Sequence, residues 1–286
     1  MDMYNRYPNS EDYFNNIYLE HFIQSFHALQ FCTSLQQVNQ EVLESKMVDL
    51  PKKGNKQKTI VFDLDETLIH CNENQDVQSD ITIQIKFPNQ EVIEAGVNIR
   101  PFCREVLKEL SKSFEIIVFT ASHSCYADKV LDYLDPNNDI IDYRLFRESC
   151  IQTAEGVHIK DLRIFKNRDL KDIVLVDNAA YSFGYQIENG IPIIPYYDNK
   201  SDIELKYLLD FLKRLVGVED VRSIIYQNFR MHLYAECQNI KEALEKVYGI
   251  VLENQLEQMQ NNNDNQQQEE MNNQIYNQNE LIMSEL

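Results

Sequence analysis

A chain of 286 residues with 43% apolar side chains can bury a sizeable core in one large domain or two small ones. Its formal net charge of −19 argues against proteins that grip nucleic acid through a general basic surface, and against adsorption to anionic membranes. No apolar run approaches the roughly 18 residues that span a bilayer, and no signal peptide is visible at the start. We therefore expect no direct nucleic-acid contact and no membrane span.

The six cysteines are scattered along the chain without a C-x-x-C pair. This usage favours free thiols in a reducing compartment over a disulfide framework or a zinc site. We therefore expect a protein of the nucleus, the cytoplasm or both.

Residues 1–57 are interpreted as an N-terminal helical and linker segment. Apolar side chains at helical spacing over residues 17–45 predict one or two amphipathic helices, and we expect them to pack onto the following domain. The basic run Pro51–Lys58 has two readings that the sequence leaves open, a solvated loop or a nuclear import signal.

Short apolar runs then alternate with helical patterns over residues 58–235. Helices are predicted at 101–112 and 124–134. Strands are predicted over four apolar runs, namely 60–62, 116–119, 173–176 and 191–195. Strands separated by helices predict an α/β fold with a parallel sheet, and the two prolines of the fourth run suit an edge strand. We treat 58–235 as one domain.

Two segments interrupt this alternation and predict β-hairpins. Residues 81–93 alternate with period two around a Pro-Asn pair, and residues 150–160 have a glycine near their middle. No large helical cap is apparent between Thr120 and Lys160, so we expect an open cleft.

The C-terminal part begins with predicted helices at 201–215 and at about 219–248. Residues 236–286 are interpreted as a helical stretch followed by a tail. More than half of residues 253–280 are Asn or Gln, a composition that cannot bury enough apolar surface to fold alone, so we expect disorder there.

Asp63 and Asp65 follow the first predicted strand and are the most informative residues of the chain. Alternate residues of a strand point to the same side, and open α/β sheets bind ligands at the carboxyl edge of their strands. Two neighbouring carboxylates repel each other unless a cation lies between them or one holds a proton. The pair therefore indicates a Mg²⁺ site, a proton-sharing pair, or both.

Later strands also end in polar groups, which are Thr120 and Ser122 after the second run and Asp177 and Asn178 after the third. Lys160 lies between them in the sequence. If the strands are parallel neighbours, these residues converge with the first aspartates. Each also has a simpler interpretation, as a helix cap, a turn or a surface lysine.

Together these segments resemble the haloacid dehalogenase superfamily, and within it the small C-terminal-domain phosphatases (FCP/SCP-like). The resemblance covers about residues 58–217. Residues 126–136 and 220–232 look closest to the small phosphatase-like 2 branch. The motifs that carry the resemblance are Phe62-Asp-Leu-Asp-Glu-Thr-Leu-Ile-His70, Arg100-Pro-Phe102, Phe119-Thr-Ala-Ser122 with Tyr126-Ala127, Arg144-Leu-Phe-Arg-Glu148, Lys160-Asp-Leu162, Arg168-Asp-Leu170, Asp177-Asn178 and Asn189-Gly-Ile-Pro192.

The resemblance implies a Rossmann-like, three-layer fold of the haloacid dehalogenase type, and it implies a role for each site residue. Asp63 would be the nucleophile and Asp65 the general acid and base. Mg²⁺ would be held by the Asp63 carboxylate, the Asp65 backbone carbonyl and Asn178. The phosphate would contact four residues, namely Thr120, Ser122, Lys160 and, as an assisting group, Arg147. Two residues would support the site, namely Asp177, which would orient Lys160 or a metal-bound water, and Thr67.

The implied function is a Mg²⁺-dependent protein serine/threonine phosphatase with an aspartyl-phosphate intermediate, acting on a flexible phosphorylated protein segment. Two alternatives remain open, a lipid-headgroup or small-molecule phosphatase and a non-catalytic phosphopeptide-binding scaffold. We expect a monomer. His70 and His123 flank the motifs and are interpreted as structural.

Overall fold

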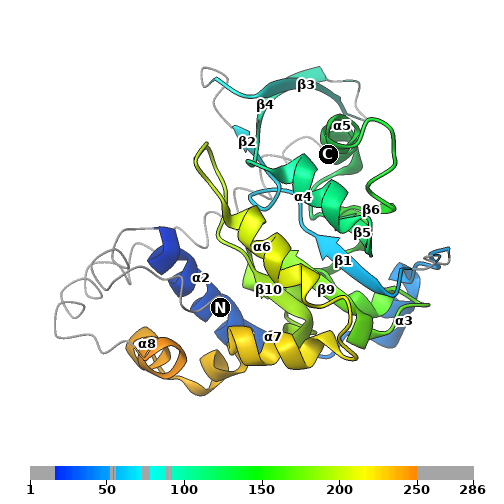
Figure 1. The fold of residues 1–286 in the computed structure, drawn as a ribbon. Coiled ribbons are helices and arrows are strands. Elements are labelled where there is room, and N and C mark those ends of the chain that lie inside the picture. The colour runs from blue at the N-terminus through cyan, green and yellow to red at the C-terminus, as the bar shows by residue number, and fades with distance from the viewer. Residues whose placement is uncertain are drawn as a thin grey trace.

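The computed structural model describes residues 17–51, 54, 56–72, 78–87, 90 and 92–249. Its centre is a five-stranded sheet in the order β10-β9-β1-β5-β6, and every neighbouring pair is parallel (Figure 1). The strands are β1 (Lys58–Phe62), β5 (Phe114–Phe119), β6 (Tyr143–Leu145), β9 (Ile173–Asp177) and β10 (Gly190–Pro192). The predicted α/β fold with a parallel sheet is therefore confirmed, and β10 lies at the edge as its prolines indicated.

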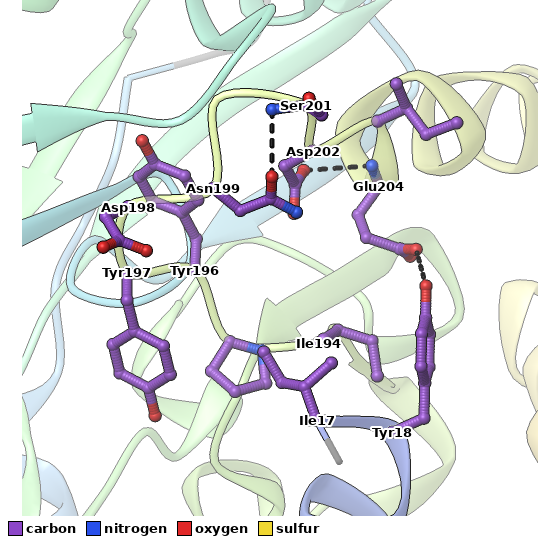
Figure 2. A pocket seen from close by; sticks show the side chains of 12 residues that line it. Ile17, Tyr18, Ile194, Tyr196, Tyr197, Asp198, Asn199, Ser201, Asp202 and Glu204 are labelled. Carbon is purple, nitrogen blue, oxygen red and sulfur yellow. Dashed lines mark hydrogen bonds between the residues drawn. The ribbon is translucent and has the colours of Figure 1, made fainter. Parts of the chain in front are cut away.

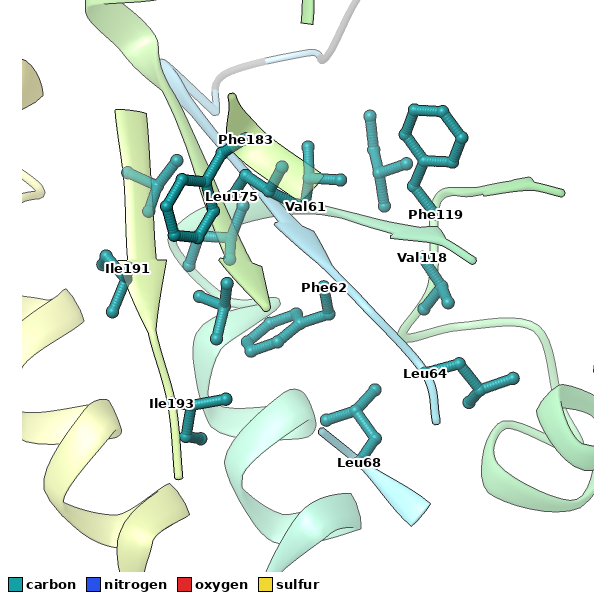
Figure 3. Packing of buried hydrophobic residues seen from close by; sticks show 14 of the residues in the cluster. Val61, Phe62, Leu64, Leu68, Val118, Phe119, Leu175, Phe183, Ile191 and Ile193 are labelled. Carbon is teal, nitrogen blue, oxygen red and sulfur yellow. The ribbon is translucent and has the colours of Figure 1, made fainter. Parts of the chain in front are cut away.

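Three central strands are apolar because both of their faces are covered. Every residue of β1, β5 and β9 is buried, which is typical of parallel strands between two layers. Figure 3 shows Phe62 projecting from β1 toward the side of α4, whereas Phe183 lies on the opposite side of the sheet. Both rings are fully buried, so the core extends through both layers.

Helices and short 3-10 helices form the two outer layers. Helix α4 (Cys103–Leu110) packs beside α6 (Glu204–Lys213), and α5 (Ser124–Leu134) connects β5 to β6. Helix α4 begins at Cys103 rather than at the predicted residue 101, because Phe102 has left-handed backbone angles (φ 66°). The described residues between β6 and α6 also contain short 3-10 helices, namely η2 (Arg147–Ser149), η3 (Leu162–Ile164), η4 (Leu170–Asp172), η5 (Ala180–Phe183) and η6 (Ile187–Asn189).

A separate antiparallel sheet with the order β2-β4-β3 lies beyond the end of β1 (Figure 1). Its strands are β2 (Ile69–Asn72), β3 (Ile81–Lys86) and β4 (Val92–Ile99). The predicted hairpin at 81–93 is therefore confirmed in its strands, and β2 adds a third strand to it; its turn at 88–89 lies outside the described residues. The predicted second hairpin is present as β7 (Ile151–Gln152) and β8 (His158–Ile159).

The N-terminal segment contains two helices, α2 (Ile17–Cys32) and α3 (Gln40–Lys46). Phe22, Phe26 and Leu29 of α2 are buried in the same core as the sheet. The expectation that these helices pack onto the domain is confirmed. The reading of Pro51–Lys58 as an import signal falls partly outside the described residues.

One helix prediction is wrong. Residues 219–248 do not form one helix but α7 (Val221–Phe229), η7 (Met231–Glu236) and α8 (Ile240–Tyr248). Arg230 takes left-handed backbone angles (φ 49°) and ends α7, and the turn buries Met231 and Tyr234 against the core. The predicted disordered tail at 253–280 lies outside the described residues.

Candidate active site

The order of the strands places a ligand site at the end of β1. From β1 the chain moves outward to β5 and β6, then returns to add β9 on the other side of β1. The strand order therefore reverses between β1 and β9, and open α/β folds bind ligands outside the carboxyl ends of the strands at such a reversal. Asp63 follows β1 and Asp177 ends β9, and the Asp63 backbone N–H donates to Val176 O at 2.9 Å.

A buried ion triad occupies this point. Lys160 Nζ donates to Asp63 Oδ1 and to Asp177 Oδ2, the latter at 2.6 Å, and the Lys160 side chain is 2% exposed. Lys160 follows β8, and its backbone N–H donates to Ser182 O at 2.8 Å, which holds it beside η5. An ammonium between two carboxylates offsets part of their burial cost and mutual repulsion.

The electrostatics of Asp63 reflect this crowding of negative charge. Burial is the main cause that raises the pKa of Asp63; Lys160 opposes the rise, and the Asp177 and Asp65 carboxylates add to it. Burial also acts to lower the pKa of Lys160, but Asp177 and Asp63 together raise it. Lys160 is therefore a permanent cation. Among the described residues, none donates a hydrogen bond to Oδ2 of Asp63.

Asp65 accepts hydrogen bonds from three hydroxyl groups. Ser122 Oγ donates to Oδ2 at 2.7 Å, Thr120 Oγ1 donates to Oδ2 at 3.3 Å, and Tyr126 OH donates to Oδ1 at 2.8 Å. The Thr120 hydroxyl also accepts from the Ser122 backbone N–H at 2.9 Å. The structure thus brings the predicted Thr120 and Ser122 to the predicted Asp65.

Tyr126 is a site residue that the sequence analysis did not identify. It lies in the first turn of α5, four residues after Ser122, and is held by the same helix start. The usable signal was the closeness of Tyr126 in sequence to Thr120 and Ser122; Ser122 itself precedes the helix, which begins at Ser124. Burial, with Asp65 and Cys71 as further causes, raises the pKa of the Tyr126 hydroxyl, so Tyr126 remains a neutral donor.

The two aspartates reach the site from different backbone environments. Strand β1 ends at Phe62, and Asp65 forms an isolated bridge with Ile69 after the chain has left the sheet. Their carboxylates therefore have different partners, an ammonium for Asp63 and hydroxyls for Asp65. This separation gives two chemically distinct carboxylates in one site, rather than a symmetric proton-sharing pair.

Asn178 lies beside the triad and is contacted from two elements. Thr67 Oγ1 donates to Asn178 Oδ1 at 3.3 Å, and His21 Nε2 lies 3.0 Å from the Asn178 backbone carbonyl. Asp177 Oδ1 accepts the Ala179 backbone N–H at 2.8 Å, which shapes the turn that presents Asn178. Thr67 thus supports the site through Asn178.

The donor chemistry at this point fits Mg²⁺. The Asp63 and Asp177 carboxylates share a single buried ammonium, and the Asp65 carboxylate is close enough to raise the pKa of Asp63. The oxygens of Asp63 and Asn178 are the hard ligands that Mg²⁺ prefers. Within the described part of the chain, no group of three or more His, Cys, Asp or Glu side chains could hold a metal ion. A protein contribution of two or three ligands suits Mg²⁺, which keeps several waters.

Arg147 is close enough to Asp65 for their charges to interact, and its hydrogen bonds lead to the loop beside the site. Its Nε donates to Ala121 O at 2.5 Å, and its Nη1 lies 3.2 Å from His123 Nε2. The guanidinium therefore supports the loop that carries Ser122, and no described hydrogen bond joins it to Asp63 or Asp65. His70 contacts Glu66 Oε1 at 3.1 Å and the ring of Tyr197, so it joins the aspartate loop to the neighbouring loop.

A cavity of about 200 Å³ lies elsewhere, between the start of α2 and residues 194–204 (Figure 2). Figure 2 shows Tyr18 donating to Glu204 across it, at 3.1 Å. None of the carboxylate, hydroxyl or lysine groups described above lines this cavity. The candidate active site is therefore the group of side chains beyond β1 and β9.

Comparison with known proteins places this site in a described family. Residues 58–222 match the family model of NLI interacting factor-like phosphatases. CTD small phosphatase-like protein 2 of Dictyostelium discoideum is 43% identical over 183 residues, covering 64% of this chain and 32% of that protein. CTD small phosphatase-like protein 3 of Caenorhabditis elegans is 37% identical over 209 residues, covering 72% of this chain and 71% of that protein.

A human relative is also similar. The human carboxy-terminal domain RNA polymerase II polypeptide A small phosphatase 1 is 38% identical over 168 residues, covering 59% of this chain and 63% of that protein. The chain spans about a third of the length of the Dictyostelium relative and more of the other two.

Proposed function

Because the chain belongs to the NLI interacting factor-like phosphatase family, we propose that it is a Mg²⁺-dependent protein serine/threonine phosphatase. The observation that carries the proposal is the convergence of Asp63, Asp65 and Lys160 at the reversal of the strand order. The site combines a buried carboxylate, a second carboxylate with its own hydrogen bonds, and a permanent cation. These groups suit attack on phosphorus, proton transfer and neutralisation of phosphate charge.

In the first step, Asp63 acts as the nucleophile. Its Oδ2 forms a bond to phosphorus while the bond from phosphorus to the serine or threonine oxygen breaks. Asp65 gives a proton to that departing oxygen, which leaves as a hydroxyl, and the phosphoryl group remains on Asp63 as an aspartyl-phosphate. The hydroxyls of Thr120, Ser122 and Tyr126 fix the direction of the Asp65 carboxyl.

In the second step, Asp65 acts as the base. It removes a proton from a water that attacks phosphorus, the bond from Asp63 to phosphorus breaks, and inorganic phosphate leaves. Lys160 stays protonated throughout and neutralises charge on Asp63 and on the transferred group, while Asp177 keeps Lys160 in place. Thr120 and Ser122 also offer hydroxyl donors to the phosphoryl oxygens.

Mg²⁺ would be held by the Asp63 carboxylate, the Asp65 backbone carbonyl and the Asn178 side-chain oxygen. When bound, it neutralises negative charge on the phosphoryl oxygens and lowers the repulsion that Asp63 meets. The excess of carboxylates over ammonium groups supports this assignment.

We propose a flexible phosphorylated protein segment as the substrate, because no helical cap covers the described site between Thr120 and Lys160. The human relative is named for the carboxy-terminal domain of a polymerase polypeptide, which supports a protein substrate. In the described part of the chain, every helix is too short or too polar to cross a bilayer. We place the protein in the nucleus, the cytoplasm or both, as a monomer without direct nucleic-acid contact.

The formal net charge of −19 implies a preference for phosphosites flanked by basic or neutral residues, because acidic peptides are repelled at long range. Turnover of matched acidic and basic phosphopeptides at low and high salt tests this preference. Equal rates at low salt would contradict it.

One assay separates the proposed function from its alternatives. Purified protein is given p-nitrophenyl phosphate, a phosphopeptide panel or phosphatidic acid with Mg²⁺, and the series is repeated with Asp63→Asn. Peptide turnover that disappears in Asp63→Asn while peptide binding remains supports a protein phosphatase. Turnover confined to phosphatidic acid indicates a lipid-headgroup enzyme, and binding without turnover by the wild type indicates a scaffold.

A further inference from the structure

Helix α2 lies outside the matched family region of residues 58–222, yet it packs along the segment that follows Asp177. His21 near its start contacts the Asn178 carbonyl, and Cys32 at its end lies against Gly184. Helix α2 also contacts η5, which lies between those two positions. A helix that the family model does not include therefore flanks the whole turn that presents Asn178.

The contact between His21 and Asn178 is buried and has a defined direction. His21 is 6% exposed, and its Nε2 lies 3.0 Å from Asn178 O. A carbonyl oxygen can only accept, so this contact requires Nε2 to carry the hydrogen. Ser25 Oγ lies 3.5 Å from the same nitrogen. Because Thr67 contacts the Asn178 side chain, Asn178 is held at both its backbone and its amide group.

Helix α2 is in turn fixed by the C-terminal elements. The ring of Phe22 lies 5.4 Å from that of Tyr234 in η7 and 5.3 Å from that of Tyr248 in α8. Gln30 Nε2 donates to Tyr234 O at 2.6 Å and to Cys237 O at 2.8 Å. Figure 1 shows α2 and α8 on the side of the molecule away from the three-stranded sheet. Residues 231–248 also lie beyond the matched region.

The close approach of α2 leaves no room on the turn. A side-chain carbon at Gly184 would lie 2.7 Å from Cys32 Sγ and 2.8 Å from Leu35 Cδ1. Both ends of the segment 178–184 are therefore in tight contact with the N-terminal segment. A shift of α2 would move the Asn178 carbonyl, and interactions that orient metal ligands from behind govern metal affinity.

We propose that His21 is a positioning residue for the metal site, acting through the backbone of Asn178. The N-terminal helix thereby completes a site that the family domain only partly specifies. This inference rests on the proposed function, because it takes Asn178 as a ligand of Mg²⁺. The His21 side chain itself touches neither the substrate nor the metal.

The test uses the full chain and Mn²⁺ alone as the probe, with free Mn²⁺ measured by electron paramagnetic resonance. His21→Leu removes the donor, whereas His21→Gln places an amide N–H near the position of Nε2. His27→Leu changes a histidine on the exposed side of the same helix and is the matched control. We expect the Mn²⁺ dissociation constant to rise about 10- to 100-fold in His21→Leu, to return within about threefold of wild type in His21→Gln, and to stay unchanged in His27→Leu.

Activity supplies a second readout. The Mg²⁺ concentration for half-maximal rate should rise in His21→Leu, while the rate at saturating Mg²⁺ changes little. Wild-type Mn²⁺ affinity in a folded His21→Leu overturns the inference. If His21→Leu and His21→Gln weaken Mn²⁺ binding equally, the inference is also overturned, because the cause would then be helix packing and not the hydrogen bond.

If His21→Leu does not fold, His21→Asn replaces it, because its shorter amide does not reach the carbonyl. Mn²⁺ affinity in His21→Asn equal to that in His21→Gln then overturns the inference. A wild-type protein that binds no Mn²⁺ removes the proposed metal site, and this inference falls with it.

Discussion

Lys160 Nζ lies 2.6 Å from Asp177 Oδ2, and the same ammonium contacts Asp63. Both partners of this ion pair are 2% exposed, so solvent screens it little. Asp177 therefore holds the cation that in turn restrains Asp63, the proposed nucleophile. We therefore expect Lys160 to affect both the free energy of unfolding and the rate of turnover.

Lys160→Met leaves two buried carboxylates without a cation. We expect the free energy of unfolding at pH 7 to fall by about 3–5 kcal/mol, because a buried pair that loses one partner leaves an uncompensated charge. Turnover should fall at least about 100-fold, since Asp63 then favours its protonated form. Urea denaturation and steady-state rates measure the two effects.

The double variant Lys160→Met with Asp177→Asn serves as the control for that prediction. It removes one of the unpaired charges, so we expect part of the stability to return without the activity. If the free energy of unfolding of Lys160→Met alone stays within about 1 kcal/mol of wild type, Lys160 does not stabilise the two buried carboxylates.

Tyr126→Phe removes one of the three hydroxyl donors to Asp65 while the ring stays in place. A hydrogen bond to a charged group contributes about 1.5–3 kcal/mol, so we expect kcat to fall roughly 10-fold or more with little change in KM. Tyr133→Phe, on the same helix with an exposed ring, should keep wild-type kinetics. Unchanged kcat in Tyr126→Phe would rule out a role for this hydroxyl in orienting Asp65.

Gly184→Ala tests how tightly the N-terminal segment packs against residues 178–184. Gly184 has ordinary helical backbone angles (φ −56°), so the cost of a methyl group is its close contact with Cys32, Leu35 and the Tyr181 carbonyl oxygen. We expect a loss of about 1–3 kcal/mol in the free energy of unfolding. Gly217→Ala, where nothing lies within 4 Å of the added carbon, should be neutral. Thermal or urea unfolding of both variants measures the difference. Equal stabilities of the two variants would contradict a tight contact between Gly184 and the N-terminal segment.

His158 gives the protein a specific dependence of stability on pH. Burial, with Arg147, His123 and Lys46 as further causes, lowers the pKa of His158 to about 4, below its ordinary value of 6.5. Between pH 6.5 and 4 the unfolded state therefore takes up a proton that the folded state does not. The contribution of His158 to the free energy of unfolding should fall over that window as pH decreases, and level off below it.

His158→Gln cannot take up this proton. The stability advantage of wild type over the variant should therefore shrink as pH falls from 7 to about 4.5. Urea denaturation of both proteins at several pH values measures the difference. A difference that stays constant across the window would show that His158 titrates normally.

The central sheet could be predicted because its strands are buried on both faces. The runs Ile60–Phe62, Ile116–Phe119 and Ile173–Val176 are apolar without interruption, and they were found to within a few residues. Strand β6 was not predicted, because its three residues include Arg144 and form no apolar run. The helix at 219–248 was predicted too long because nothing in the composition around Arg230 marks a left-handed turn.

Some residues of the candidate site could be predicted from the sequence and others could not. Asp63, Asp65, Thr120 and Asp177 follow recognisable strands, so their convergence follows from a parallel sheet. Tyr126 was not identified because its ring also satisfies the apolar spacing of α5. His21 could not be identified, since its contact with Asn178 spans 157 positions in the sequence and depends on how α2 packs.

The proposed mechanism requires Asp63 to carry the phosphoryl group between its two steps. The most direct measurement is to mix the protein and Mg²⁺ with a phosphopeptide, quench in acid, reduce with borohydride and map the modified aspartate by mass spectrometry. We expect modification at Asp63 alone and its absence in Asp63→Asn. With p-nitrophenyl phosphate, whose leaving group needs no acid, we expect modified Asp63 to accumulate in Asp65→Asn, which lacks the base for hydrolysis. Turnover of the peptide with no modification at Asp63, or with modification of another residue, would contradict it.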